Sequence, residues 1–209
     1  MKQLAWVVLI VGGLSLPALS APVYQAGQPA ASVRTWLHGE ISADYQFASQ
    51  YLETDEGSEN TSALKGWGGR ALWAPLPWLS IGAELTQFGD ESLKEAFVSS
   101  YEKTRLVGLV KFTLSPNTSP RVYLLAGYGR DKHEINYDHA AMLATWPESD
   151  SKTTSFWMLG LGAEVNVWKI VFVGVEGNIL RHQTTQLPRF YQIDSKTETA
   201  LRVRAGVRF

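Results

Sequence analysis

The sequence of 209 residues contains no cysteine, which excludes a disulfide framework and every metal site built on thiolates. It carries no excess charge of either sign, because its formal net charge is −1. A nucleic-acid partner would require clustered basic charge, so we expect none. After residue 20 no window reaches the roughly 18 consecutive apolar residues of a membrane-spanning helix, so we expect no helical span there.

The N-terminal segment has the composition of a secretory signal peptide. Lys2 supplies a positive charge, residues 4–16 form an apolar core, and small residues precede a cleavage site at Ser20–Ala21. An uncleaved membrane anchor is the alternative, but the apolar run is short and is interrupted by two glycines and a proline. We expect residues 1–20 to be removed, residues 21–32 to form an irregular lead-in, and residues 33–209 to form one domain.

The last segment of the chain alternates strictly between two kinds of residue. Counted back from the C-terminus, Phe209, Val207, Ala205, Val203 and Leu201 are apolar, and Arg208, Gly206, Arg204 and Arg202 stand between them. Successive side chains of a β-strand point to opposite faces, so this strand has one apolar and one cationic face. A half-buried strand of a soluble protein is one interpretation, but such alternation over about ten residues is also typical of a transmembrane β-strand.

The same period of two recurs along the chain and predicts eight strands, the first running from residue 33 to Phe47. The others are expected at 63–74, 78–88, 101–114, 121–130, 154–167, 170–180 and 197–209. The connections at 50–62, 89–100, 131–152 and 181–196 are long, whereas those at 75–77, 115–120 and 168–169 are short. Long loops at one end and short turns at the other are typical of outer-membrane barrels.

Aromatic residues gather near the short turns, as expected at a membrane–water interface. They are Trp73, Trp78, Phe112, Tyr123, Trp168 and Phe209. A soluble barrel would show the same alternation with its apolar face inside, but it would not explain the loop asymmetry or this girdle. We therefore predict an all-β fold, an eight-stranded antiparallel up-and-down transmembrane β-barrel with short periplasmic turns and four longer extracellular loops.

Several segments together resemble a known superfamily. The signal peptide, the glycine-rich strands containing GYG and GLGAE, and the closing RVRAGVRF are similar to eight-stranded bacterial outer-membrane β-barrels. That group includes the OmpA membrane domain, OmpX, Ail and the neisserial opacity proteins. The resemblance covers residues 33–209, is architectural, and transfers no catalytic residue. Full-length OmpA continues into a periplasmic domain, whereas we expect none after Phe209.

The resemblance also implies a location and partners. It implies insertion into the outer membrane of a Gram-negative cell, in contact with membrane lipid and lipopolysaccharide. It further implies recognition of the C-terminal strand by the barrel-assembly machinery, through Val203, Ala205, Gly206, Val207 and Phe209.

The alternation places many charged residues in the barrel interior. The expected set is Glu40, Asp44, Arg70, Glu84, Lys103, Arg105, Lys111, Arg130, Glu164, Glu176, Arg202, Arg204 and Arg208, with Glu40, Glu84, Glu176, Arg202 and Arg204 at mid-barrel height. An eight-stranded barrel is just wide enough for its side chains to fill, and buried charges must pair. One interpretation is a salt-bridge network that plugs the lumen. The other is a gate whose rearranged pairs admit water and small ions.

Enzymatic chemistry has little support in the sequence. A lipid A deacylase would need a serine, a histidine and an acid on the outer surface, and His182 with Thr184, Thr185 and Glu176 is the nearest approximation. Its residues depart from the His-x-Ser-Asn pattern of that family. A protease site would need paired aspartates at a strand rim, whereas Asp131, His133, Asp138 and His139 are expected in a loop. We predict no catalytic residue, no cofactor and no metal site.

The loops are where binding is expected, because rigid scaffolds display functional residues on loops. The loop at 131–152 contains the apolar residues Met142, Leu143 and Trp146, which form a candidate contact surface for a protein or lipopolysaccharide. The leading hypothesis is a structural or surface-interaction protein of the opacity and OmpX type. A narrow porin-like pore is the second hypothesis, and a lipid A-modifying enzyme is a weaker third.

Overall fold

The computed structural model describes residues 38–49, 52–54, 64–90, 98–137, 149–188, 191–193 and 195–209. Within these ranges the chain is all β. The strands are β1 (His38–Ala48), β2 (Leu52–Thr54), β3 (Leu64–Leu76), β4 (Leu79–Asp90), β5 (Val98–Thr113), β6 (Arg121–Tyr137), β7 (Ser149–Asn166), β8 (Val171–His182), β9 (Tyr191–Ile193) and β10 (Thr197–Arg208). The expected signal peptide and lead-in lie outside the described residues.

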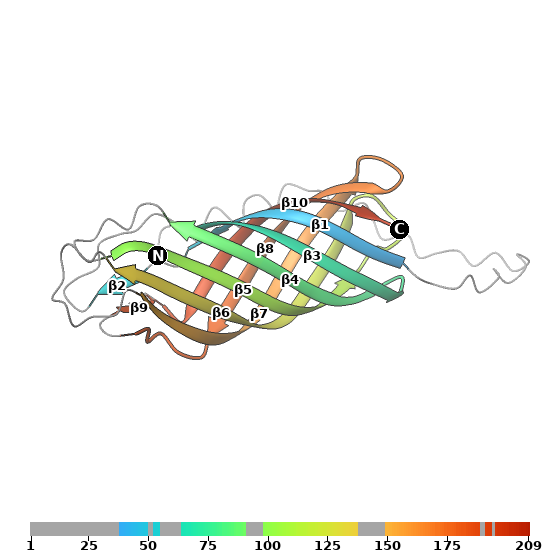
Figure 1. The fold of residues 1–209 in the computed structure, drawn as a ribbon. Coiled ribbons are helices and arrows are strands. Elements are labelled where there is room, and N and C mark those ends of the chain that lie inside the picture. The colour runs from blue at the N-terminus through green and yellow to red at the C-terminus, as the bar shows by residue number, and fades with distance from the viewer. Residues whose placement is uncertain are drawn as a thin grey trace, which may run out of the picture. The chain divides into compact units, whose positions relative to one another are not determined.

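Eight of these strands close into one antiparallel barrel, in the order β1-β10-β8-β7-β6-β5-β4-β3 (Figure 1). The first and last strands complete the ring, with register pairs from Glu40 and Arg208 to Ala48 and Ala200. Two further backbone hydrogen bonds join Gly39 and Phe209, at 2.8 and 3.0 Å. Closure pairs the edge strands with each other, which satisfies their backbone donors and acceptors. The predicted fold class is confirmed.

The long and short connections lie at opposite ends of the barrel (Figure 1). The strands at the long-loop end continue further than the sequence pattern predicts. β6 extends to Tyr137 and β7 begins at Ser149, so the loop expected at 131–152 is wrong at both ends. Two loop segments, β2 and β9, also pair with each other in a small separate sheet. Strands of three residues carry too short a pattern for the sequence to predict this sheet.

The outward face of the barrel wall is apolar over its middle and at its short-turn end. The exposed large hydrophobic residues include Ile41, Trp73, Leu85, Leu106, Leu159, Val175, Ile179 and Val203. Two predicted orientations on β6 are wrong. Arg130 is exposed on the outer wall, and Tyr123 is fully buried inside the barrel and so cannot belong to the aromatic girdle. Both faces of β6 near its start are apolar, so hydropathy could not show which face is inside.

The polarity of the wall inverts toward the long-loop end. Above the exposed aromatic pair Tyr128 and Trp157, the outward residues of β6 are Arg130, Lys132 and Glu134. The inward residues at the same end form a buried apolar cluster instead. We call it the mouth cluster, and it comprises Ala48, Leu64, Phe88, Tyr101, Ile135, Tyr137, Leu187 and Ile193. Water therefore bathes the outside of this part of the wall. Among the described residues there is no helix long and apolar enough to cross a membrane.

Candidate functional site

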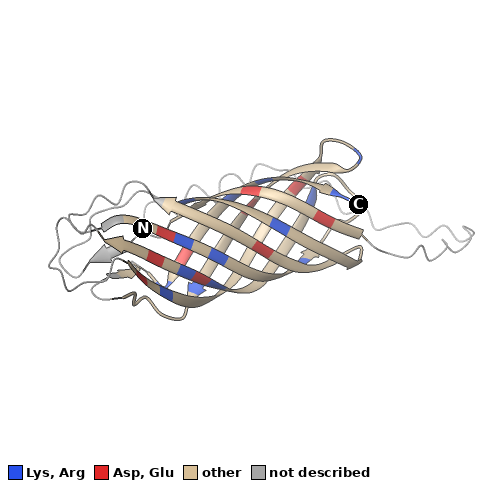
Figure 2. Ribbon diagram, viewed as in Figure 1, with Lys and Arg blue, Asp and Glu red and all other residues tan. Residues whose placement is uncertain are grey.

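The lumen is the most chemically dense part of the described structure. Figure 2 shows acidic and basic residues distributed along the barrel strands. Seven buried carboxylates face six buried cations, the carboxylates being Glu40, Asp44, Glu84, Asp131, Glu164, Glu176 and Glu198, and the cations Arg70, Lys103, Arg105, Lys111, Arg202 and Arg204. Two partly buried cations, Arg208 and Arg121, lie near Glu40 and Glu164 at the short-turn rim. The numbers of acidic and basic side chains in the lumen are therefore similar. This similarity matters because an unpaired buried charge is strongly destabilising.

The central cluster surrounds Arg70 on β3. Its guanidinium lies 2.7 Å from the Glu84 carboxylate on β4 and 2.8 Å from the Glu176 carboxylate on β8, across the lumen. Arg202 on β10 donates to Glu84 as well, and its Nη2 donates to the Gln46 Oε1 at 2.7 Å. Each guanidinium therefore bridges strands that are not neighbours in the sheet. Such contacts fill the lumen with a cross-braced network.

A second cluster lies toward the short turns, around Lys111 on β5. The Lys111 ammonium lies 2.9 Å from Glu40 and 3.0 Å from Glu164. Arg204 contacts the same two carboxylates, at 2.6 and 3.0 Å, and lies 3.6 Å from Glu176 in the central cluster. Glu40 therefore belongs with this lower group, and its expected mid-barrel height is wrong.

The third cluster lies toward the long loops and centres on Arg105. The Arg105 guanidinium lies 2.7 Å from Asp131 and 2.9 Å from Glu198, and Lys103 lies 3.2 Å from Glu198. Sequence reasoning missed Glu198. Glu198 is an even number of positions from Arg202 and Arg204, so the alternation of side chains along the strand places it on the same face. This spacing alone could have identified Glu198 as a lumen residue.

Both histidines near this cluster are buried. His133 contacts the Tyr101 hydroxyl at 2.7 Å and the Thr154 hydroxyl at 2.9 Å. His182 Nε2 lies 3.3 Å from Glu198. The expected loop position of Asp131 and His133 is therefore wrong, because β6 continues through both of them. His182 faces the lumen, so it cannot serve a deacylase site on the outer surface. Asp138 and His139 lie outside the described residues.

One group in this cluster has ligand atoms close enough for a metal ion. Asp131, His182 and Glu198 each place a donor atom within 4.8 Å of the others. However, Arg105 pairs with both carboxylates and Lys103 pairs with Glu198. The two cations already neutralise the two carboxylates, so a divalent ion would have to displace them. The arrangement fits a salt-bridge cluster better than a metal centre.

Some buried polar atoms of the lumen have no hydrogen-bond partner in the described structure. They include Ser42 Oγ, Gln46 Nε2 and both carboxylate oxygens of Asp44 on β1, and further atoms on β6, β8 and β10. The nearest cation to Asp44 is Arg202, with 3.7 Å between Asp44 Oδ1 and Arg202 Nε. The β1 side of the lumen is therefore polar and incompletely paired within the described residues.

Above the three clusters, the mouth cluster fills the long-loop end of the barrel. Leu187 and Ile193 come from the segment between β8 and β10, and they are 5% and 2% exposed. Their partners are inward-facing side chains of β1, β3, β4, β5 and β6. Ile193 is held in position by the pairing of β9 with β2. Leu187 and Ile193 of this connection therefore pack inside the barrel at its long-loop end.

The structure thus places all eight residues of the expected charge network inside the barrel. They are Glu40, Arg70, Glu84, Arg105, Glu164, Glu176, Arg202 and Arg204. They fall into the three clusters described above. The candidate contact residues Met142, Leu143 and Trp146 lie outside the described residues.

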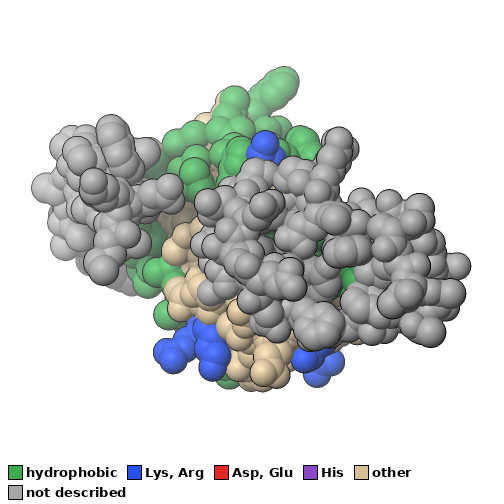
Figure 3. All heavy atoms as spheres, turned by 90° about the vertical axis from the view of Figure 1, so that its left-hand side faces the viewer, with side chains coloured by type: hydrophobic (Ala, Val, Ile, Leu, Met, Phe, Trp, Pro, Cys, Tyr) green, Lys and Arg blue, Asp and Glu red, His purple; other side chains and the backbone are tan. Residues whose placement is uncertain are grey.

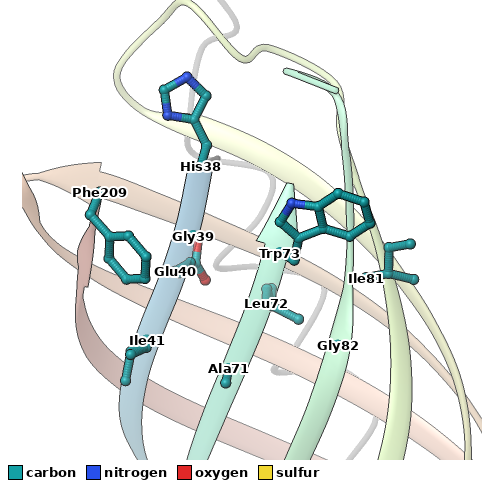
Figure 4. Close-up of a pocket in the computed structure, with 10 residues that line it drawn as sticks. All are labelled: His38, Gly39, Glu40, Ile41, Ala71, Leu72, Trp73, Ile81, Gly82 and Phe209. Carbon is teal, nitrogen blue, oxygen red and sulfur yellow. The ribbon is translucent and has the colours of Figure 1, made fainter. Parts of the chain in front are cut away.

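The expected assembly residues lie on the seam between β10 and β1. Val203, Ala205 and Val207 face outward, and Gly206 is packed against the Ile41 backbone and the Phe172 ring. The Phe209 ring lies over Gly39 on the neighbouring strand, at the edge of an apolar groove bounded by Trp73 and Ile81 (Figure 4). A Cβ atom on Gly39 would lie 2.4 Å from that ring, so only glycine leaves room for it.

The chain is similar to several solved outer-membrane barrels. Neisserial surface protein A shares 12% identity over 81% of this chain and 95% of that chain, with a TM-score of 0.55. The attachment invasion locus protein Ail of Yersinia pestis shares 14% identity over 83% of this chain and 99% of that chain, with a TM-score of 0.54. Ail has also been solved in complex with the heparin analogue sucrose octasulfate, at 15% identity and a TM-score of 0.54. No curated protein matches the sequence.

A family model decides the classification. The model of the outer membrane protein beta-barrel domain matches residues 11–209, which is nearly the whole chain. The closed barrel, its apolar outer wall and its loop asymmetry agree with this match. The chain therefore belongs to the outer membrane protein β-barrel family and resides in the bacterial outer membrane.

Proposed function

We propose that this protein is a non-enzymatic, non-conducting barrel that anchors long surface loops for contact with an external partner. Two features of the barrel interior support the proposal. Three ion-pair clusters lie along the lumen, and the apolar mouth cluster lies at its long-loop end. Ions would have to separate buried pairs and then pass an apolar constriction, and each step is costly.

The loops are the remaining surface for function. Ail, whose fold this chain shares, has been solved with a heparin analogue, which shows that a barrel of this architecture can bind an external ligand. We assign the contact surface of this chain to the loop containing Met142, Leu143 and Trp146. The C-terminal strand, with Phe209 at its end, is the segment proposed to engage the barrel-assembly machinery.

A narrow pore is the second candidate, and one observation favours it. The two carboxylate oxygens of Asp44 have no hydrogen-bond partner, and Ser42 and Gln46 beside it have unpaired polar atoms. A row of polar side chains along β1 could hold a chain of water molecules. This chain could conduct small ions if the central ion pairs rearranged. The closed barrel and the narrow pore therefore differ in whether the ion pairs of the clusters separate and let ions pass.

Single-channel conductance of the refolded mature chain in a planar bilayer decides between them. We expect silence from the wild type and from Glu84→Ala and Arg204→Ala, with folding checked by heat-dependent gel mobility. Discrete openings whose size or frequency changes in either variant would overturn the closed-lumen proposal. Leu187→Ser tests the mouth cluster separately, and openings in this variant alone would assign closure to the mouth.

Loop binding needs its own measurement. Binding of the refolded chain to immobilised heparin and to cultured epithelial cells is compared with binding of the Met142→Ser/Leu143→Ser/Trp146→Ser variant. We expect the wild type to bind at least one surface and the variant to bind it at least tenfold more weakly. Equal binding by the two proteins would remove this loop from the proposal.

A further inference from the structure

The outer wall carries two unpaired arginines beside an aromatic pair at the end of the apolar band. Tyr128 on β6 is opposite Trp157 on β7, with ring centroids 4.7 Å apart. Trp157 is in turn opposite Arg181 on β8. Arg130 is the next outward residue after Tyr128, toward the long loops. The three strands thus display one compact group, which we call the wall site: Tyr128, Arg130, Trp157 and Arg181.

The height of the wall site is defined by its neighbours. Below it, the outward residues Leu159 and Ile179 are apolar and exposed. Above it, the outward residues of β6 and β7 are polar or charged, including Lys132 and Thr153. Tyrosine and tryptophan concentrate at such a boundary because their rings are amphipathic. The wall site therefore lies at the headgroup level of the outer leaflet.

The charge around the wall site is uncompensated within the described residues. Opposite Arg130 are Leu106 and Ser155, and opposite Arg181 are Trp157 and Thr197. The first outward carboxylate above Arg130 on β6 is Glu134, and it is paired with Lys132. Figure 3 views the barrel from the long-loop end and shows several Lys and Arg side chains on its surface. Among the described residues, the two arginines have no carboxylate to pair with on this part of the wall.

We propose that the wall site binds the phosphate of an outer-leaflet glycolipid, with its acyl chains lying on the apolar wall below. Arginine suits this ligand because its planar guanidinium forms paired, charge-assisted hydrogen bonds with phosphate. Arg130 and Arg181 project from strands two apart and are offset by two residues along β7. Their backbones are therefore about 12 Å apart, a separation that a phosphorylated sugar headgroup can span. This assignment is independent of the loops and of whether the lumen conducts.

Native mass spectrometry of the refolded mature chain in detergent micelles tests the assignment. The probes are bisphosphorylated lipid A, the same lipid without its phosphates, and inorganic phosphate. We expect lipid A to bind the wild type, and the Arg130→Gln/Arg181→Gln variant to show an apparent Kd about tenfold higher or more, as the loss of charge-assisted hydrogen bonds requires. The dephosphorylated lipid should bind wild type and variant equally and weakly.

Two single substitutions serve as matched controls. Lys132→Gln removes a charge from the same strand and face, but that charge is already paired with Glu134. Lys169→Gln removes an exposed charge from the opposite end of the barrel. Both should leave lipid A binding unchanged. Equal binding of lipid A by wild type and the double variant, or equal effects of the control substitutions, would overturn the assignment. Displacement of lipid A by millimolar inorganic phosphate would also overturn it, in favour of a free-phosphate site.

Discussion

At the scale of single residues, the lumen depends on a few side chains that each hold several partners. Arg70 contacts Glu84 and Glu176 through three of its nitrogen atoms. Removing it would leave two buried carboxylates to share Arg202. An intact buried ion pair adds little to the free energy of unfolding. Removing one partner lowers that free energy strongly, because the other charge is left buried and unpaired.

We therefore expect Arg70→Met to lower the free energy of unfolding by about 3–5 kcal/mol. Lys132→Met is the matched control, because Lys132 and Glu134 form an exposed pair whose side chains are 55% and 40% accessible. Its effect should stay below about 1 kcal/mol. Urea unfolding in lipid vesicles measures both. Similar effects of the two substitutions would contradict the cross-braced lumen.

Two glycines of the wall provide a second test of packing at the residue scale. A Cβ on Gly162 would lie 2.2 Å from the Tyr123 ring, whereas a Cβ on Gly177 would meet no atom within 4 Å. Gly162→Ala should displace the ring, weaken its 3.1 Å hydrogen bond to Glu176, and cost about 1–3 kcal/mol. Gly177→Ala should change stability by less than about 0.5 kcal/mol. The same unfolding assay distinguishes them, and a neutral Gly162→Ala would show that the ring can move freely.

At the scale of elements, the seam between β1 and β10 combines backbone pairing with one tight side-chain contact. Gly39→Ala would push against the Phe209 ring and cost stability in the wild type. In a Phe209→Ala background the same substitution should cost much less, because the ring is absent. A double-mutant cycle by urea unfolding should give a coupling of about 0.5–3 kcal/mol between the two sites. Additive effects would mean that the ring does not rest on Gly39.

Most of the barrel could be predicted from the sequence, because strict alternation encodes which residues face out. The alternation fails as a guide where both faces are alike. Tyr123 is flanked by apolar residues on both faces of β6, and the charge of Arg130 suggested the lumen although it lies at the headgroup level. Leu187 and Ile193 lie in a loop without periodicity, so their insertion into the mouth depends on tertiary contacts that no local pattern records. The partners of Glu198 likewise come from distant strands.

At the scale of the whole molecule, most charges of the lumen are buried and belong to ion pairs. Screening acts on exposed charges, whereas buried pairs are screened much less. We expect the free energy of unfolding to change by less than about 1 kcal/mol when NaCl is raised from low concentration to about 1 M. Urea unfolding at several salt concentrations measures this. A steep loss of stability with salt would show that electrolyte reaches the clusters.

The inversion of wall polarity at the Tyr128–Trp157 pair fixes how thick a bilayer the protein can accept. On β7 and the turn after it, exposed apolar residues run from Trp157 to Val167. Ten residue steps of about 3.3 Å, tilted by about 40°, span about 25 Å. In a thicker bilayer, acyl chains would be forced against Arg130 and Lys132, and the membrane would thin around the barrel to avoid that contact. Hydrophobic mismatch would therefore direct this protein toward thin membranes, independently of any ligand.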